Sequence, residues 1–191
     1  MKPEQKKWLL LFLLLALTVL VTALLRVPVP LSVTIGGRDA GVYVTLGDVC
    51  VFFAVLLCGT PWGALIAALG MALADLLVGS YSYIIGSFLI KGGMALFIGA
   101  FATRCSGWKA CFRAAFLAEG IMIAGYFVYD LTVFGQYAIA AYQIPLNLLQ
   151  GLVCGAAGAC LLQCIPPRVR GLLDPARPGA YYAGTGNRRV R

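Results

Sequence analysis

Three charged residues, Asp48, Asp75 and Lys91, lie within or at the edges of long apolar stretches, in the segments GDV, ADLLVG and IKG. Charged residues are scarce in this chain, at 12% of its length. Burying an ionised group in hydrocarbon costs about 2.5–3.5 kcal/mol even on lenient scales, so buried charges usually have partners and a role. The pattern therefore indicates either an internal ion pair or the polar lining of a binding site.

Two amide side chains, Asn147 and Gln150, occur three residues apart in a later apolar stretch. Residues at that spacing share one face of a helix. Primary amides both donate and accept hydrogen bonds, so such a pair suits the edge of a heterocyclic ligand. The same pair can instead hold neighbouring helices together.

The composition is that of a membrane protein, with 61% hydrophobic residues and a mean hydropathy of +0.91. Several apolar stretches are long enough to cross about 30 Å of hydrocarbon as helices. We predict an all-α membrane protein in which residues 1–165 form one domain of six transmembrane helices. These are expected at residues 8–25, 44–58, 62–78, 84–102, 114–129 and 145–165. Pro145 is expected in the first turn of the sixth helix, where its missing N–H is tolerated.

Several function classes fit the sequence poorly. The chain has no histidine, which argues against histidine-dependent membrane enzymes such as metalloproteases and rhomboid-type proteases. Its seven cysteines include no C-x-x-C pair, and its seven acids are dispersed. No G-x-x-x-x-G-K-[ST] motif is present, so ATP binding through a P-loop is not expected. We expect no metal, no cofactor and no enzymatic activity.

The basic residues predict the orientation in the membrane, because cytoplasmic loops are enriched in Lys and Arg. With six spans, twelve of the 15 Lys and Arg fall on one side: the first residues, the loop between spans four and five, and the C-terminal segment. Both termini are therefore expected in the cytoplasm. Residues 166–191, rich in Pro, Gly and Arg, are expected to form a basic, disordered cytoplasmic tail.

This topology brings polar residues from five helices to the outer third of the membrane. A concave pocket with a few polar groups among aromatic side chains is what a small polar ligand needs. The predicted substrate-binding residues are Asn147, Gln150, Lys91, Tyr126, Asp130, Tyr83 and Tyr43. Asp48 and Asp75 are predicted to be structural, with Asp48 capping the second span and Asp75 pairing with Lys91. Glu119 is expected to pair with Arg113 or Lys109, or else to contact a partner subunit.

A stripe of small residues in the third span, Ala64, Ala68 and Ala72, repeats every four positions. Small residues at that spacing let helix backbones approach closely. The stripe can serve internal packing or the docking of another membrane subunit.

Six segments carry a family resemblance: YVTLGD, PWGAL, ADLLVG, FLIKG, GYF and IPLNLLQG, in this order from residue 43 to residue 151. Together they resemble the S components of energy-coupling factor (ECF) vitamin importers, over nearly all of residues 8–165. The similarity is to the riboflavin-transporter-like branch, which includes proteins assigned to pyridoxine and hydroxymethylpyrimidine.

The resemblance implies a substrate-binding subunit in the plasma membrane of a prokaryote, with its site near the outer face. It also implies docking onto a transmembrane ECF T subunit and two cytoplasmic ECF ATPases that supply the energy. Many S components carry an Ala-x-x-x-Ala docking motif on the first span, whereas here Ala16 is followed four residues later by Leu20. The alanine stripe of the third span is the alternative docking surface.

The leading hypothesis is thus an S component that captures a small vitamin-like heterocycle for ATP-driven uptake. The alternative is a self-sufficient secondary transporter or channel for a small polar solute. A membrane enzyme is a third class, but it would need clustered acids to hold a metal. The sequence leaves the substrate open among pyridoxine, hydroxymethylpyrimidine, riboflavin and other heterocycles.

Overall fold

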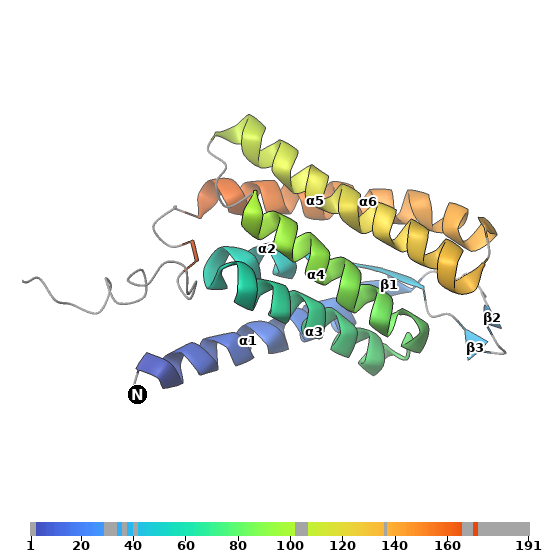
Figure 1. Cartoon of the computed structure of the whole chain (residues 1–191), viewed down its shortest axis with the longest axis horizontal. Coiled ribbons are helices and arrows are strands. Elements are labelled where there is room, and N and C mark those ends of the chain that lie inside the picture. Colours follow the sequence, from blue (N-terminus) through green and yellow to red (C-terminus); the bar gives the residue numbers. More distant parts are fainter. Residues whose placement is uncertain are drawn as a thin grey trace, which may run out of the picture.

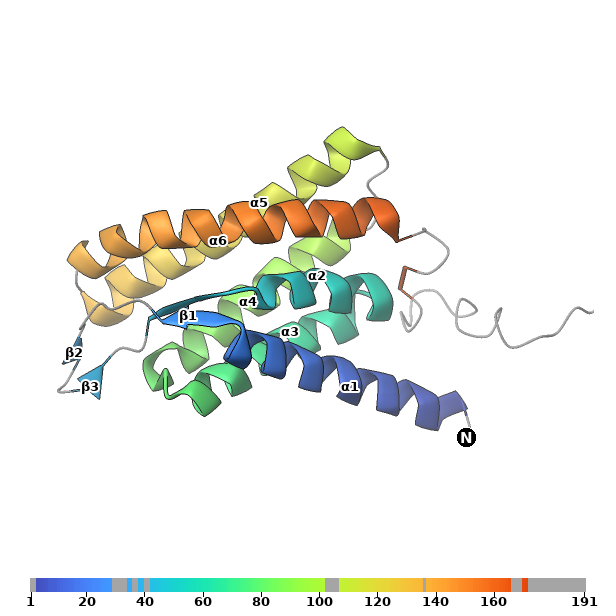
Figure 2. The same cartoon turned by 180° about the vertical axis from the view of Figure 1, so that it is seen from behind.

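The computed structural model describes residues 3–28, 34–35, 38–39, 42–101, 107–135, 137–165 and 170–171. This part of the chain folds into a bundle of six α-helices (Figures 1 and 2). The helices are α1 (Pro3–Leu24), α2 (Gly47–Cys58), α3 (Thr60–Val78), α4 (Ile84–Ala100), α5 (Trp108–Tyr129) and α6 (Tyr137–Cys164). A 3-10 turn, η1 (Tyr81–Tyr83), precedes α4, and a π-helical turn, η3 (Asp130–Phe134), follows α5.

Two short antiparallel strand pairs connect α1 to α2, and the sequence analysis did not predict them. Strand β1 (Arg26–Pro28) pairs with β4 (Tyr43–Thr45), and β2 (Thr34–Ile35) pairs with β3 (Arg38–Asp39). The helix expected at residues 44–58 therefore begins only at Gly47, because Tyr43–Thr45 is extended. The aromatic and β-branched side chains of this segment favour a strand once a partner is available.

Two further helices begin well before their predicted first residues. Helix α5 starts at Trp108 instead of residue 114, and α6 starts at Tyr137 instead of residue 145. Pro145 lies inside α6, so its expected place in the first turn is wrong. Proline removes only one N–H donor, and neighbouring helices make such a loss tolerable within a membrane-embedded bundle.

Five helical segments in the described part of the chain are long and apolar enough to cross a membrane. They are Glu4–Leu24, Thr60–Val78, Tyr81–Ala100, Trp108–Phe134 and Ile139–Cys164. Helix α2 has 12 residues and is about 18 Å long, which is short of the hydrocarbon thickness. The all-helical membrane architecture is thus observed, while six complete spans and cytoplasmic termini stay predictions. The start of α1 and the end of α6 do lie at the same end of the bundle (Figure 1).

Helix α2 forms the centre of the bundle and contacts α1, α3, α4 and α6. Nine of its 12 residues are buried. Val51, Phe52, Val55 and Leu56 form one apolar cluster with side chains from α3, α4, α5 and α6. A helix that is apolar on every side belongs in a core. The longer helices therefore enclose α2 and leave room beyond its N-terminus.

Two residues of the predicted tail also contact this core. Gly171 donates its backbone N–H to the carbonyl oxygen of Leu56 at 2.7 Å. The Arg170 guanidinium donates to the carbonyl oxygens of Ile165, at 2.9 Å, and Leu162. The cation thus bonds carbonyl groups at the end of α6, where the helix dipole favours positive charge. Residues 166–169 and 172–191 lie outside the described residues.

Close packing between α2 and α3 depends on Gly63. A Cβ atom at this position would lie 2.5 Å from the Cα atom of Val55, which is backbone and cannot swing away. Gly93 in α4 is a matched contrast, because a Cβ atom there would meet nothing within 4 Å.

We predict that Gly63→Ala lowers the melting temperature of the detergent-purified protein, because overpacking a core typically costs about 1–3 kcal/mol. Gly93→Ala should leave the melting temperature unchanged or raise it, since alanine has a higher helix propensity than glycine at an exposed position. Equal melting temperatures for the two variants would contradict the close α2–α3 contact.

Candidate substrate-binding site

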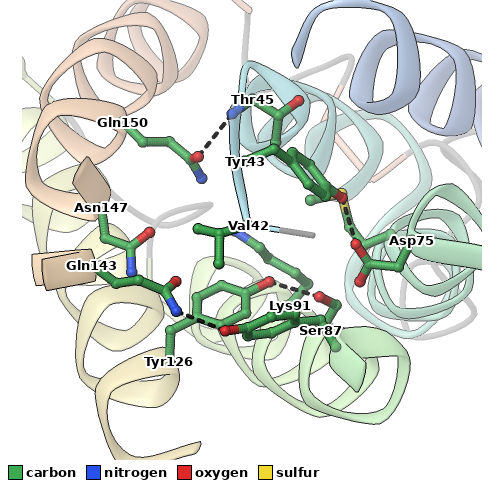
Figure 3. A pocket seen from close by; sticks show the side chains of 12 residues that line it. Val42, Tyr43, Thr45, Asp75, Ser87, Lys91, Tyr126, Gln143, Asn147 and Gln150 are labelled. Atoms are coloured by element: carbon green, nitrogen blue, oxygen red, sulfur yellow. Dashed lines mark hydrogen bonds between the residues drawn. The ribbon is translucent and has the colours of Figure 1, made fainter. Parts of the chain in front are cut away.

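A cavity of about 40 Å³ with many polar lining residues lies beside β4, next to the β1–β4 strand pair. Residues from β4, α3, η1, α4, α5 and α6 surround it (Figure 3). The lining residues are Val42, Tyr43, Thr45, Met71, Asp75, Tyr83, Ser87, Lys91, Tyr126, Gln143, Asn147 and Gln150. Of the seven predicted substrate-binding residues, six line this cavity and Asp130 does not.

An ion pair between Lys91 of α4 and Asp48 of α2 forms the floor of the site. The ammonium group of Lys91 donates to Oδ1 of Asp48, and the side chains are 1% and 0% exposed. The Nε2 of Gln150 donates to the other carboxylate oxygen at 2.7 Å. The Lys91 ammonium also lies 5.3 Å from the ring centroid of Tyr126, within cation–π range. The charge of Lys91 is therefore satisfied by the protein itself.

This pairing corrects two predictions about the buried acids. Lys91 pairs with Asp48, not with Asp75. Asp48 does not cap α2 either, because Leu46 is the N-cap residue and no side chain bonds the cap. Asp48 lies in the first turn of α2, and its carboxylate points toward α4 and α6. Sequence spacing cannot predict this choice, because it depends on how α2 is placed between α4 and α6.

Gln150 joins α6 to β4 as well as to α2. Its Oε1 accepts the backbone N–H of Thr45 at 2.9 Å, while its Nε2 holds Asp48. One turn further along α6, the thiol of Cys154 lies 3.7 Å from the carbonyl oxygen of Thr45. Both ends of the Gln150 amide are thus used by the fold, although the residue borders the cavity.

Asn147 differs from Gln150 in this respect. It borders the same cavity one turn earlier on α6 and is 8% exposed. No hydrogen bond joins its amide to another described residue, and Figure 3 shows bonds from Gln143 and Gln150 but none from Asn147. Its donors and its acceptor are therefore available to a ligand.

Aromatic residues and their hydroxyl groups form the next wall of the cavity. The Tyr126 hydroxyl lies 2.8 Å from Oγ of Ser87. Gln143 donates to the Tyr83 hydroxyl at 2.7 Å, and that hydroxyl donates to Oδ1 of Asp130 at 3.1 Å. Asp130 thus stands behind Tyr83, fully buried, and can act on a ligand only through that tyrosine.

Tyr43 and Asp75 close the opposite side. The Tyr43 hydroxyl donates to Oδ1 of Asp75. Burial, and next the neighbouring Asp75 carboxylate, raise the pKa of Tyr43 well above its usual range. The hydroxyl therefore stays protonated at physiological pH and remains a donor.

Five lining residues were missed by the sequence analysis: Val42, Thr45, Met71, Ser87 and Gln143. Gln143 had a detectable signal, because it lies four residues before Asn147 and seven before Gln150, on one helix face. Starting the sixth helix at Pro145 hid that relation. Thr45 joins the site through its backbone N–H, which no side-chain pattern indicates.

Glu119 of α5 is buried next to the ion pair and does not pair with Arg113 or Lys109 as expected. Neither of its carboxylate oxygens has a hydrogen-bond partner among the described residues. It lies close enough to Asp48 and Lys91 to interact electrostatically with both. Cβ atoms at Gly151 and Gly155 would come within 3.3 Å of its side chain. These glycines make the room in α6 that Glu119 occupies.

The alanine stripe of α3 is partly taken up by internal packing. Ala68 is buried and faces Gly92 of α4, where a Cβ atom would lie 3.4 Å from the Ala68 methyl group. Ala64 and Ala72 are half-buried. A docking role for the stripe stays a prediction and rests on these two outer alanines.

The arrangement is suited to noncovalent recognition. The cavity presents a free amide, a carboxylate oxygen, hydroxyl groups and three aromatic rings, all on helices or a paired strand. Among the described residues, no group of three or more His, Cys, Asp and Glu could hold a metal ion.

Comparison with known proteins gave one family match. A family model described as "ECF-type riboflavin transporter, S component" matches residues 3–166, which include every residue that lines the cavity. No curated protein matches the chain.

We predict that Lys91→Met destabilises the protein strongly, because it leaves the Asp48 carboxylate buried without a cation. Breaking a buried pair in this way typically costs about 3–5 kcal/mol. The double variant Lys91→Met, Asp48→Asn should recover most of the lost stability. Thermal unfolding of the wild type, the single variant and the double variant in one detergent measures the loss and recovery of stability. A single variant as stable as the double variant would refute the pairing.

Proposed function

Since the chain belongs to the family of ECF-type riboflavin transporter S components, we propose that its polar cavity captures a small vitamin-like heterocycle. S components are the substrate-binding subunits of ECF importers. The substrate enters from the outer face of a prokaryotic plasma membrane. Uptake is driven by ATP hydrolysis in separate subunits, an ECF T subunit linking this chain to two ECF ATPases. The chain itself performs no covalent chemistry.

The observation that carries this proposal is the contrast between Asn147 and its polar neighbours. Lys91, Gln150, Gln143 and Tyr83 are hydrogen-bonded within the protein. Asn147 faces the same cavity with an uncommitted amide and is 8% exposed, so its donors and acceptor can bond a ligand. The tyrosine rings beside it supply flat apolar surfaces of the kind that heterocycles stack on.

The size of the cavity favours a compact ring. A volume of about 40 Å³ has room for only a few water molecules. The described cavity is therefore narrow, and a single ring needs less space than the three fused rings of riboflavin. Pyridoxine and hydroxymethylpyrimidine are accordingly the first compounds to test, with riboflavin as the compound in the family's name.

Mass spectrometry of the small molecule that co-purifies with the protein is the most direct test of the substrate class. A heterocycle of vitamin type is the expected finding. Recovery of a lipid headgroup or an inorganic ion in its place would redirect the assignment.

We predict that Asn147→Ala and Gln150→Ala separate binding from stability. Asn147→Ala should weaken binding of the co-purified compound about ten- to hundredfold, the equivalent of about 1–3 kcal/mol, because ligand groups lose their partner in a dry site. Its melting temperature should barely change. Gln150→Ala should lower the melting temperature, since Thr45 and Asp48 both lose a hydrogen bond.

Affinity by calorimetry and melting temperature by light scattering, measured on both variants and the wild type, decide the matter. Normal affinity in both variants would show that the binding site lies elsewhere.

We also predict that the purified protein binds its ligand without ATP and hydrolyses none, because the sequence has no P-loop motif. Concentrative uptake into cells should require co-expression of an ECF T subunit and its ATPases. Proteoliposomes that hold this chain alone supply the contrast. Strong uptake by them would favour a secondary transporter, whose path could use the buried Glu119.

A further inference from the structure

Asp75 has an unsatisfied carboxylate oxygen beside the cavity. The residue is 2% exposed, and its Oδ1 accepts the Tyr43 hydroxyl. Its Oδ2 is buried and has no hydrogen-bond partner among the described residues. Ser87 is close enough to interact with this carboxylate, and its hydroxyl also lies 2.8 Å from that of Tyr126. One acceptor atom of the site is therefore left for another molecule.

The fold gives Asp75 no cation. The one ion pair among the described residues joins Lys91 to Asp48, so Lys91 attracts Asp75 only from beyond salt-bridge distance. Asp75 also lies in the last turn of α3, where the backbone carbonyl groups make the helix terminus negative. A negative side chain at this place is disfavoured by its own helix.

Two carboxylates at or next to the cavity are not neutralised by an ion pair in the described part of the chain. Among the described residues, Lys91 is the one basic residue that lines the cavity, and Asp48 neutralises it. The Arg26 guanidinium lies outside the lining, 6.0 Å from the ring centroid of Tyr43. Asp75 faces the cavity and Asp130 stands behind Tyr83, and neither forms an ion pair in the described part of the chain. The site is therefore suited to positive charge and unsuited to a carboxylate or phosphate.

Asp75 and Asn147 approach the cavity from opposite sides. Figure 3 shows Asp75, beside Tyr43, across the cavity from Asn147 and Gln143. A flat ring between them can give a hydrogen bond to the carboxylate at one edge and exchange hydrogen bonds with the amide at the other. Tyr83 and Tyr126 line the same space.

From these observations we infer that Asp75 is a ligand-binding residue that selects heterocycles with a protonated ring nitrogen or an N–H donor and rejects anionic ones. This inference rests on the proposed function and narrows its substrate class. It also gives Asp75 a binding role where the sequence analysis predicted a structural one.

The test compares the wild type with Asp75→Asn, which keeps the size of the side chain and an acceptor for Tyr43. Glu119→Gln is the control, because it removes a buried carboxylate that does not line the cavity. The probes are pyridoxine, 4-amino-5-hydroxymethyl-2-methylpyrimidine and riboflavin, with 4-pyridoxic acid and riboflavin 5′-phosphate as anionic counterparts. Calorimetry in detergent gives each dissociation constant.

The wild type should bind at least one of the three uncharged probes and should bind the anionic probes at least tenfold more weakly. Asp75→Asn should weaken binding of that preferred probe tenfold or more. It should also reduce the ratio between the affinities for that probe and for the anionic probes. Glu119→Gln should leave unchanged both the affinity for the preferred probe and its ratio to the affinity for the anionic probes. An unchanged preference in Asp75→Asn would overturn the inference and leave the proposed function standing.

If Asp75→Asn does not fold, the affinities of the wild type for the uncharged and anionic probes still test the inference. Anionic probes that bind the wild type as tightly as their uncharged counterparts would overturn the inference without any variant. Failure of every probe to bind, with no small molecule co-purifying, would instead overturn the proposed function.

Discussion

The buried ion pair between Lys91 and Asp48 is the interaction on which the rest of the site depends. An unpaired charge in the centre of this bundle would be costly, so α4 and α2 are held where the two groups meet. Gln150 completes the carboxylate's hydrogen bonds and brings α6 and the backbone of β4 to the same point. Helices α2, α4 and α6 and strand β4 are thereby fixed around one carboxylate.

The short length of α2 makes room for the cavity. This helix fills the core with Val51, Phe52, Val55 and Leu56, but it begins only at Gly47, after the extended segment of β4. The space beyond it is occupied by the extended segment of β4. Extended backbone deep in a membrane protein must have its polar groups satisfied. Pairing with β1 and the bond from Thr45 to Gln150 meet that requirement and fix β4 beside the cavity.

The sequence predicted the helical architecture and half of the cavity lining, because hydropathy and rare buried polar residues are strong signals. It could not predict which acid pairs with Lys91, because Asp48 and Asp75 are both plausible until α2 and α3 are placed around α4. The start of α6 was predicted wrongly because Pro145 prefers the first turn of a helix. Packing of α6 against α5 outweighs that local preference. Thr45 contributes a backbone group, and backbone groups carry no sequence signature.

Residues of the same type differ here in whether the protein itself satisfies their polar groups. Asn147 and Gln150 are amides one turn apart, yet β4 and Asp48 occupy only Gln150. Asp48 and Asp75 are both buried acids, yet Lys91 pairs only with Asp48. Unpaired oxygens also occur on Glu119 and Asp130, but neither residue lines the cavity. An unpaired group can recognise a ligand only where the packing gives the ligand access, and among these residues Asn147 and Asp75 meet both conditions.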